Sequence, residues 1–242
     1  MRVSRIFQDM PLQSGEQIVL NEEGGHYLRT VLRLKKGANI VIFNGQGGEY
    51  LGNIMESSRK RVAINILEWI DKNVESNLQV NFGLSVSKGS RMDYAIQKAV
   101  ELGVHVISPL ISERTVVKLT EDKKSQKIKH WQKIATHASE QCGRTWVPVI
   151  NDVQPLFEWT HQQSGVRVFL DPNATTKFSS LELKQPMITL LAGPEGGFAQ
   201  QERVKVADSG FVSVQLGKRI LRSETAALAA LAAVQTLWGD YG

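Results

Sequence analysis

Apolar runs of strand length that alternate with helical segments constrain the fold of this chain more than any other feature of its sequence. One run, QVNFGLSV, lies at residues 79–86, and three more follow at 166–171, 187–193 and 211–217. Strands that are apolar along their whole length are typical of parallel sheets covered on both faces. The helical segments between the runs are available to cover both faces. The pattern therefore predicts that residues 73–242 form an α/β domain with a mainly parallel sheet and flanking helices.

Capping signals indicate where two of these helices begin and where one of them ends. Ser90 and Asp93 have the spacing of a capping box, and Gly103 is expected to end the helix that they begin. Ser223 is expected to cap the helix that closes the chain, over residues 223–239.

The first 72 residues have a strand-rich pattern, and we expect them to fold separately as a small closed β barrel. Only residues 21–36 have helical spacing in this part of the chain. The polar stretch DKNVESN, at residues 71–77, is interpreted as a linker. The chain is therefore predicted to divide into residues 1–72 and 73–242. The expected strands of the first domain lie at residues 3–7, 16–20, 38–57 (a hairpin) and 61–70.

Composition and charge narrow the function classes. The formal net charge is +5 and the isoelectric point is about 9.3, which weakly favours a polyanionic partner. Cys142 is the only cysteine, so an intrachain disulfide is excluded and a reducing compartment is expected. The sequence has neither a signal peptide nor an apolar run of about 18 residues, so we expect a cytoplasmic protein without a membrane segment. His130 and His137 lack the spacing of a zinc site, so no bound metal is expected.

Two strand exits end in glycine and lead into helices, and both are candidates for a ligand-binding loop. In the first, GPEGG at residues 193–197, Pro194 fixes one φ angle and the glycines let backbone groups approach a ligand closely. The second begins at Gly217 and is rich in lysine and arginine. Ligands bind α/β sheets at the carboxyl ends of the strands, so the two loops are expected to share one pocket. For the first loop, a tight strand-to-helix turn without a ligand is the alternative. For the second loop, the alternative is a turn whose basic residues are simply solvated.

Six segments, spread over both predicted domains, carry a family resemblance. The two most specific are GPEGGF (193–198) and LGKRILRSETA (216–226). The others are HYLRTVLRL (26–34), IQKAVELGVHVISPL (96–110), SERTVVK (112–118) and EQCGRTWVP (140–148). Together these segments resemble the SPOUT class of methyltransferases, and in particular the bacterial small-subunit ribosomal RNA uridine-N3 methyltransferases of the RsmE type.

The resemblance implies a fold, a cofactor and partners. It implies an N-terminal PUA-like β barrel and a C-terminal α/β domain with a trefoil knot, an exception to the general absence of knots. It also implies S-adenosylmethionine as cofactor, held by the two glycine-ended loops. The implied partners are 16S ribosomal RNA or the small ribosomal subunit, and a second copy of the chain in a homodimer. The residues expected to bind the cofactor are Leu170, Leu191, Gly193, Pro194, Glu195, Gly196, Gly197, Leu216, Gly217, Ile220, Leu221 and Arg222.

Methylation of uracil N3 displaces a weakly acidic proton, so a carboxylate base and an arginine that stabilises negative charge are expected to help. The candidate catalytic residues are Glu140, Arg144, Arg222 and Glu224, with a structural ion pair as the alternative for each acid and its neighbouring arginine. Arg29 and Arg33 lie four residues apart on the predicted helix and are expected to share one face. The residues expected to contact RNA are Arg5, His26, Arg29, Arg33, Lys88, Arg91 and Arg114.

Two other functions stay open at this point. One is a SPOUT methyltransferase that acts on another ribosomal RNA site or on transfer RNA, against which HYLRTVLRL (26–34) favours the uridine-N3 group. The other is a non-catalytic RNA-binding factor in ribosome assembly. The intact segments GPEGG and LGKRILR weigh against that second alternative.

Overall fold

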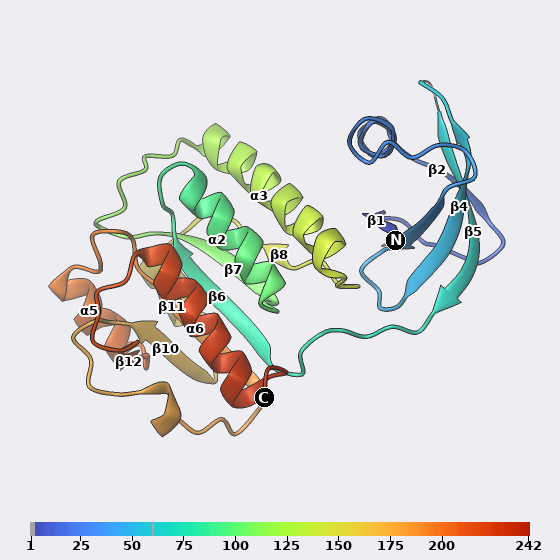
Figure 1. Ribbon diagram of the computed structural model, residues 1–242. Coiled ribbons are helices and arrows are strands. Elements are labelled where there is room, and N and C mark those ends of the chain that lie inside the picture. The colour runs from blue at the N-terminus through green and yellow to red at the C-terminus, as the bar shows by residue number, and fades with distance from the viewer. Residues whose placement is uncertain (1–2, 60) are drawn as a thin grey trace. The chain divides into compact units, whose positions relative to one another are not determined.

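The computed structural model describes residues 3–59 and 61–242, which divide into two compact units (Figure 1). The first unit runs to Glu75 and also contains Ser139–Val147. The second unit contains Ser76–Ala138 and Pro148–Gly242. The chain therefore leaves the second unit at residue 139 and returns to it at residue 148. Local sequence patterns do not indicate this excursion.

The first unit is strand-rich, as the alternating sequence pattern predicts. Its sheet has the order β1-β3-β4-β5-β2, with β1 parallel to β3 and the other neighbours antiparallel. Ile40 and Ile42 of β3 and Ile64 and Ile66 of β5 alternate along their strands and are all buried in one core cluster. The strands are β1 (Ser4–Phe7), β2 (Gln17–Val19), β3 (Asn39–Phe43), β4 (Glu49–Ser57) and β5 (Val62–Ile70).

The expected barrel is not closed by hydrogen bonds all the way round. Among the described strands, the pairing order leaves β1 and β2 as its two ends. A five-stranded barrel that is partly open is a common form of small β domain.

The predicted helix over residues 21–36 is shorter in the structure and changes type. Helix α1 (Glu22–His26) begins after Asn21, whose Oδ1 accepts a hydrogen bond from the Gly24 N–H at 2.8 Å. A π-helical turn, η1 (Tyr27–Val31), follows it directly. The wider π turn changes which side chains lie above one another.

Arg33 follows this helical segment instead of lying within it. Its φ angle is +53°, in the left-handed region that residues other than glycine, asparagine and aspartate rarely adopt. The helical path therefore ends before Arg33. The prediction that Arg29 and Arg33 share one face of a helix is wrong.

The second unit contains the parallel sheet that the apolar runs predict. Its order is β12-β10-β11-β6-β7-β8, with the short β9 also paired to β7. Every pairing among its described strands is parallel. All four predicted strand runs are confirmed. The strands are β6 (Gln79–Ser85), β7 (Val106–Ile111), β8 (Val149–Ile150), β9 (Gln154–Pro155), β10 (Val166–Leu170), β11 (Met187–Ala192) and β12 (Val212–Val214).

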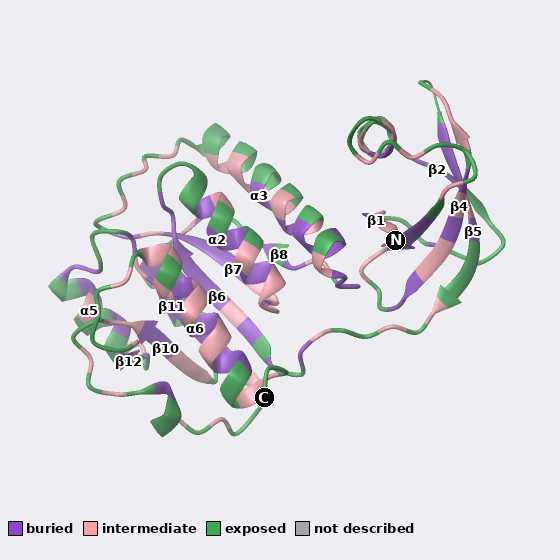
Figure 2. Ribbon diagram, in the orientation of Figure 1, coloured by how far each residue is buried: buried purple, intermediate pink, exposed green. Residues whose placement is uncertain are grey.

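Helices cover both faces of this sheet, and most residues of the central strands between them are buried (Figure 2). On one face α2 packs against α6, and α6 packs against β11. On the other face α4 packs against β7 and α5. There a Cβ on Gly83 would lie 2.4 Å from the Trp159 ring, so α4 approaches the strand closely. The helices are α2 (Ser90–Glu101), α3 (Glu121–Cys142), α4 (Leu156–His161), α5 (Gln200–Asp208), α6 (Ser223–Trp238) and the short 3-10 turn η2 (Phe178–Ser180).

The side chains expected to cap α2 and α6 have other roles. Asp93 accepts a hydrogen bond from Trp131 Nε1 at 3.2 Å and so joins α2 to α3. The N-cap of α2 is Gly89, which has no side chain to cap with. Ser223 is the first residue of α6 instead of its N-cap, which is Arg222. Both capping predictions are therefore wrong, because tertiary partners and neighbouring loops decide where these helices begin.

Among the helices of the described residues, none combines the length and the apolar character that crossing a bilayer requires. The same residues contain no group of three His, Cys, Asp or Glu side chains arranged to hold a metal ion.

Candidate active site

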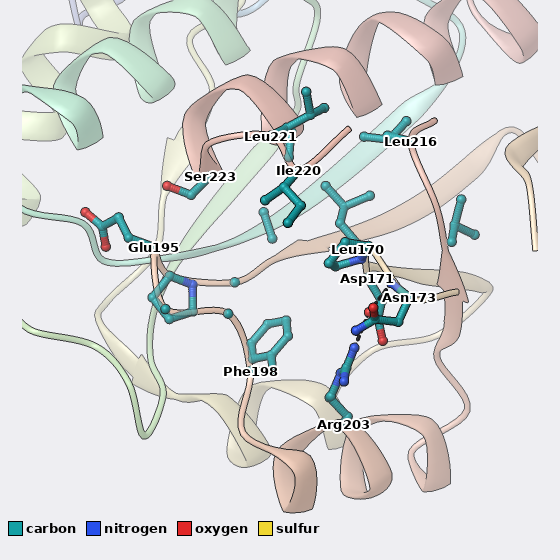
Figure 3. Close-up of a pocket in the computed structure, with 18 of the residues that line it drawn as sticks. Leu170, Asp171, Asn173, Glu195, Phe198, Arg203, Leu216, Ile220, Leu221 and Ser223 are labelled. Atoms are coloured by element: carbon teal, nitrogen blue, oxygen red, sulfur yellow. Dashed lines mark hydrogen bonds and ion pairs between the residues drawn. The ribbon is translucent and has the colours of Figure 1, made fainter. Parts of the chain in front are cut away.

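A cavity of about 320 Å³ opens at the carboxyl ends of three adjacent strands, β10, β11 and β12 (Figure 3). This is the end of an α/β sheet at which ligands bind. The loops that follow β11 and β12 both line it, which confirms the expectation of a shared pocket. The lining residues are Arg114, Leu170, Asp171, Pro172, Asn173, Ala192, Gly193, Pro194, Glu195, Gly196, Gly197, Phe198, Arg203, Val214, Leu216, Gly217, Arg219, Ile220, Leu221, Ser223 and Ala226.

The loop at residues 193–197, named the first loop below, is a tight turn whose shape depends on glycine. The Gly197 N–H donates to the Pro194 carbonyl oxygen at 2.9 Å, and Gly197 has φ +63°. A Cβ on Gly193 would lie 3.1 Å from the Phe198 ring, closer than side chains ordinarily pack. The backbone of this loop therefore borders the cavity without side chains at its glycine positions.

Two arginines from other elements contact the first loop. Arg91 Nη1 lies 3.1 Å from Glu195 Oε1, and Arg114 Nη1 donates to the Gly196 carbonyl oxygen at 2.9 Å. Both arginine side chains are exposed to solvent. The residues predicted to contact RNA at these two positions therefore also contact the loop that borders the cavity.

The loop after β12, named the second loop below, lies against the segment that follows β10. The Gln215 N–H donates to the Thr176 carbonyl oxygen at 3.0 Å, and Gln215 Nε2 donates to that of Pro172 at 2.7 Å. Gly217 has φ +71°, which a residue with a Cβ would adopt only under strain. Ile220 lines the cavity and is 89% exposed, so the cavity has an apolar side chain at its mouth.

An ion pair that the sequence analysis did not identify completes the wall of the cavity. Asp171 directly follows β10, and its Oδ1 accepts hydrogen bonds from Arg203 of α5 and from the Asn173 N–H. The Asp171 and Arg203 side chains point toward each other in Figure 3 and are 11% and 25% exposed. The sequence signal that could have identified Asp171 is an acidic residue at the carboxyl end of a predicted parallel strand.

All of the residues predicted to bind the cofactor line the cavity except Leu191 and Arg222. Leu191 is fully buried in a core cluster with Trp159 and Phe169, beneath α4 and α5. It faces away from the cavity because successive side chains of a strand point to opposite sides. Arg222 is exposed at the start of α6.

Two of the four candidate catalytic residues have structural partners in the first unit. Glu140 is 7% exposed, and its Oε1 accepts the Phe7 N–H at 2.9 Å. Arg144 is 4% exposed, and its Nε donates to Glu75 Oε2 at 2.8 Å. These contacts give both residues structural partners other than each other, and a catalytic role for them stays a prediction.

The other two, Arg222 and Glu224, are neighbours of the cavity-lining Ser223. Glu224 is half-buried and accepts a hydrogen bond from the Ser223 hydroxyl at 3.2 Å. Within the part of the chain that the structure describes, no ion pair joins Arg222 to Glu224. The structural ion pair considered as their alternative role is therefore not formed.

Arg5 is buried and is not placed to contact RNA phosphates, contrary to the sequence prediction. It is 8% exposed, pairs with the buried Glu49, and donates to the Arg144 carbonyl oxygen at 2.9 Å. Its guanidinium group also lies 5.0 Å from the centre of the Phe43 ring. The pair with Glu49 offsets the cost of removing this cation from water inside the first unit.

The remaining residues predicted to contact RNA differ in how freely they reach solvent. His26, Arg33 and Lys88 are exposed. Arg29 is half-buried and donates a hydrogen bond to the Ser58 carbonyl oxygen. The exposed residues are available to a polyanion, whereas Arg29 also connects the helical segment to the loop after β4.

Two known protein domains match the sequence of this chain. The domain described as the RNA methyltransferase domain matches residues 74–235, and the RNA methyltransferase PUA domain matches residues 20–67. The first match covers the second unit up to residue 235 and includes every residue that lines the cavity.

Known proteins that share one name are similar to this chain over nearly their whole length. The chain is 34% identical to ribosomal RNA small subunit methyltransferase E of Buchnera aphidicola subsp. Acyrthosiphon pisum, over 99% of this chain and 96% of that protein. It is 30% identical to the protein of the same name from Bacillus subtilis, over 96% of each chain.

Solved structures of similar proteins have the same fold. Ribosomal RNA small subunit methyltransferase E from Neisseria gonorrhoeae, bound to S-adenosyl methionine, matches with a TM-score of 0.94 and 34% identity over 100% of both chains. A Legionella pneumophila protein in complex with the cofactor SAM matches with a TM-score of 0.97 and 34% identity, over 99% of this chain and 100% of that one. The chain therefore belongs to the family of the ribosomal RNA small subunit methyltransferase E proteins, which are RNA methyltransferases with a PUA domain.

Proposed function

We propose that this protein methylates N3 of a uridine in small-subunit (16S) ribosomal RNA, with S-adenosylmethionine as the methyl donor. The observation that carries the proposal is the cavity between the two glycine-ended loops at the carboxyl ends of β11 and β12. Relatives that are 34% identical over nearly their whole length are small-subunit ribosomal RNA methyltransferases, and similar structures contain the cofactor. The choice of uridine N3 comes from the sequence resemblance.

The residues around the cavity fit this cofactor. Leu170, Leu216 and Leu221 provide apolar contacts for a flat ring such as adenine, and the glycine backbone provides hydrogen-bonding groups. Asp171 places a carboxylate in the wall, where its ion pair with Arg203 holds it in position. A cavity of about 320 Å³ also has the size of pockets that hold small ligands.

The reaction requires the protein to hold the uracil in place and to accept the proton that N3 loses. S-adenosylmethionine supplies a methyl group bonded to a positively charged sulfur. Holding N3 in line with that methyl group is worth much of the rate. We assign proton acceptance from N3 to Glu224 and stabilisation of the negative charge on the base to Arg222, because both adjoin the cavity-lining Ser223. Glu140 and Arg144 are the second candidates for these roles.

RNA contacts are proposed for the exposed basic residues His26, Arg33 and Lys88, and in part for Arg29, Arg91 and Arg114. Arg5 is left out because it is buried in an ion pair. Since ribosomal RNA is the substrate, we expect the protein to act in the cytoplasm.

The trefoil knot is proposed for the region of the two loops. Support comes from Gln215, which hydrogen-bonds to Pro172 and Thr176 in the segment between β10 and β11. Helix α6 then packs against η2 of that same segment. The chain after β12 therefore runs beside the β10–β11 connection, as a threaded segment must.

A homodimer and a domain boundary near residue 72 are also proposed. The exposed Ile220 at the cavity mouth suits a surface that a second copy covers. The two domain matches, at residues 20–67 and 74–235, support a boundary between residues 67 and 74. Sedimentation velocity is expected to give the mass of a dimer, and a monomer at micromolar concentration would contradict the homodimer.

The proposed activity is tested by methyl transfer from labelled S-adenosylmethionine to small ribosomal subunits that lack the modification. Digestion of the RNA and mass spectrometry then identify the labelled nucleoside. Label in N3-methyluridine is the expected result. Free 16S RNA, transfer RNA and large subunits serve as parallel substrates.

Each other result points to a specific alternative. Label in a different nucleoside or a different RNA would favour a SPOUT methyltransferase with another target. A protein that binds the RNA but neither binds S-adenosylmethionine nor transfers its methyl group would favour the non-catalytic assembly factor. Calorimetry of cofactor binding separates these two outcomes.

A further inference from the structure

Two arginines from different elements meet adjacent residues of the first loop. Arg91, in the first turn of α2, pairs with Glu195 at 3.1 Å. Arg114, in the segment after β7, donates to the Gly196 carbonyl oxygen at 2.9 Å. A Cβ on Gly196 would lie 3.3 Å from Arg114 Cβ, so the stem of this arginine also packs on the loop. The two adjacent residues at the tip of the loop are therefore each held by an arginine from another element.

The segment that carries Arg114 is itself fixed by α5. The Glu113 N–H donates to Glu202 Oε1 at 2.8 Å, and the Ala199 N–H donates to Glu202 Oε2 at 2.9 Å. Glu202 is 4% exposed. One buried carboxylate thus joins the base of the Arg114 segment to the start of the helix that follows the first loop.

The first loop needs anchors because its own residues restrain it weakly. Gly196 and Gly197 have no side chains, and the Gly197 N–H to Pro194 O bond closes the turn. Fixing the backbone of a flexible residue costs about 1–2 kcal/mol. A ligand that must order a loose loop when it binds has its affinity reduced by that free energy. A loop that is already ordered does not reduce the affinity in this way.

We propose that Arg91 and Arg114 are positioning residues of the cofactor site, which hold residues 193–197 in the shape that binds S-adenosylmethionine before any RNA arrives. This inference rests on the proposed function. Arg114 lines the cavity, whereas Arg91 is not among its lining residues. Any effect of Arg91 on cofactor affinity therefore passes through Glu195. Contact with RNA phosphates alone would leave that affinity unchanged.

The test is isothermal calorimetry of S-adenosylmethionine and S-adenosylhomocysteine with the full-length protein and no RNA. Arg91→Ala is expected to weaken binding about twofold to fivefold, the range of an exposed ion pair. Arg114→Ala is expected to weaken it about threefold to tenfold, because it loses a charged hydrogen bond and a packed stem. The Arg91→Ala and Glu195→Gln effects should not multiply in the double variant, since each removes the same interaction.

Hydrogen exchange of the loop amides gives a second readout that is independent of affinity. Exchange at residues 195–199 should be faster in Arg91→Ala and Arg114→Ala than in the wild type. Arg91→Lys should restore most of the protection, because it keeps a cation beside Glu195. Lys118→Ala is the matched control, since Lys118 is an exposed cation in the same segment as Arg114 and has no ion pair with the first loop among the described residues.

Three results would overturn the inference in different ways. Wild-type affinity and wild-type exchange in both arginine variants would leave the arginines with RNA contact only. An equal loss in Lys118→Ala would show that general positive charge, and not the anchors, sets the affinity. A wild-type protein that does not bind S-adenosylmethionine would overturn the proposed function itself, which is distinct from the first two outcomes.

Discussion

The Phe7 N–H donates a hydrogen bond of 2.9 Å to the carboxylate of Glu140, which lies 133 residues further along the chain. This bond fastens β1 to residues 139–147, the part of the chain that joins the first unit from a distance. Arg5 adds a second bond to the same part, to the Arg144 carbonyl oxygen at 2.9 Å. Glu140 is therefore a structural group, and a catalytic role for it has to be separated from this one.

Substitution of Glu140 distinguishes the two roles. Glu140→Ala is expected to lower the free energy of unfolding by about 1–3 kcal/mol, because the Phe7 N–H loses its acceptor. Glu140→Gln keeps an acceptor oxygen and should cost less. Urea denaturation measures both, beside methyl transfer. If Glu140→Gln were as stable as the wild type but abolished methyl transfer, Glu140 would be the base and the assignment to Glu224 would be wrong.

The buried ion pair of Arg5 is expected to matter for stability. Arg5→Met should lower the free energy of unfolding by about 3 kcal/mol, because Glu49 stays buried and, among the described residues, keeps Lys72 as its one ion-pair partner. The matched control is Arg61→Ala, which breaks an exposed pair with Glu56 at 3.9 Å and should cost less than about 0.5 kcal/mol. Equal losses in the two variants, measured in urea, would mean that burial adds nothing to the Arg5 pair.

A bulky side chain on the first loop should block the cavity. Gly196→Trp is expected to abolish binding of S-adenosylmethionine in calorimetry, while the melting temperature changes little because Gly196 is exposed. Val204→Trp, on the exposed surface of α5, is the control for an added indole. Unchanged binding in Gly196→Trp would show that the cofactor site lies elsewhere.

The left-handed conformation of Arg33 gives a test of its contact with RNA. Arg33→Gly should raise the free energy of unfolding by about 1 kcal/mol, since it removes the strain of φ +53°. The same variant should bind RNA more weakly. The slope of log affinity against log salt concentration should become smaller by the amount expected for about one phosphate contact. Filter binding at several salt concentrations measures both changes. An unchanged salt slope would exclude Arg33 from the RNA interface.

Alkaline pH is expected to act on the fold through Tyr27. Burial raises the pKa of the Tyr27 phenol, and the Glu140 carboxylate raises the pKa further. The folded state therefore holds this proton more tightly than the unfolded chain, whose tyrosine pKa is about 10. The stability that Tyr27 contributes is complete below about pH 10 and is lost as the pH rises through the higher folded pKa.

Tyr27→Phe removes the titrating group and keeps the ring. Between about pH 9 and pH 11 the melting temperature of the wild type should therefore fall more steeply than that of Tyr27→Phe. The melting temperature of Glu140→Gln should fall less steeply with pH than that of the wild type, because the substitution removes one cause of the raised pKa of Tyr27. If the melting temperatures of all three proteins fell equally with pH, Tyr27 would have the same pKa in the folded and the unfolded state.

The architecture of the sheet and the position of the cavity follow from local patterns in the sequence. A fully apolar run such as residues 187–193 specifies a buried parallel strand, because such a strand has no face for water. The glycines after β11 and β12 mark backbone that must turn sharply, and they border the cavity. Both features depend only on residues that are neighbours in the sequence, so they can be predicted from the sequence without knowledge of the tertiary structure.

Tertiary structure alone decided what the charged residues do. Arg5, Arg91 and Arg114 have the same local appearance as any surface arginine, yet Arg5 is buried against Glu49 and the other two contact the first loop. Their partners lie between 44 and 139 residues away in the chain. The energy of a charged side chain depends on its solvent exposure and on the nearest opposite charge or acceptor. Neither quantity exists until distant segments pack together.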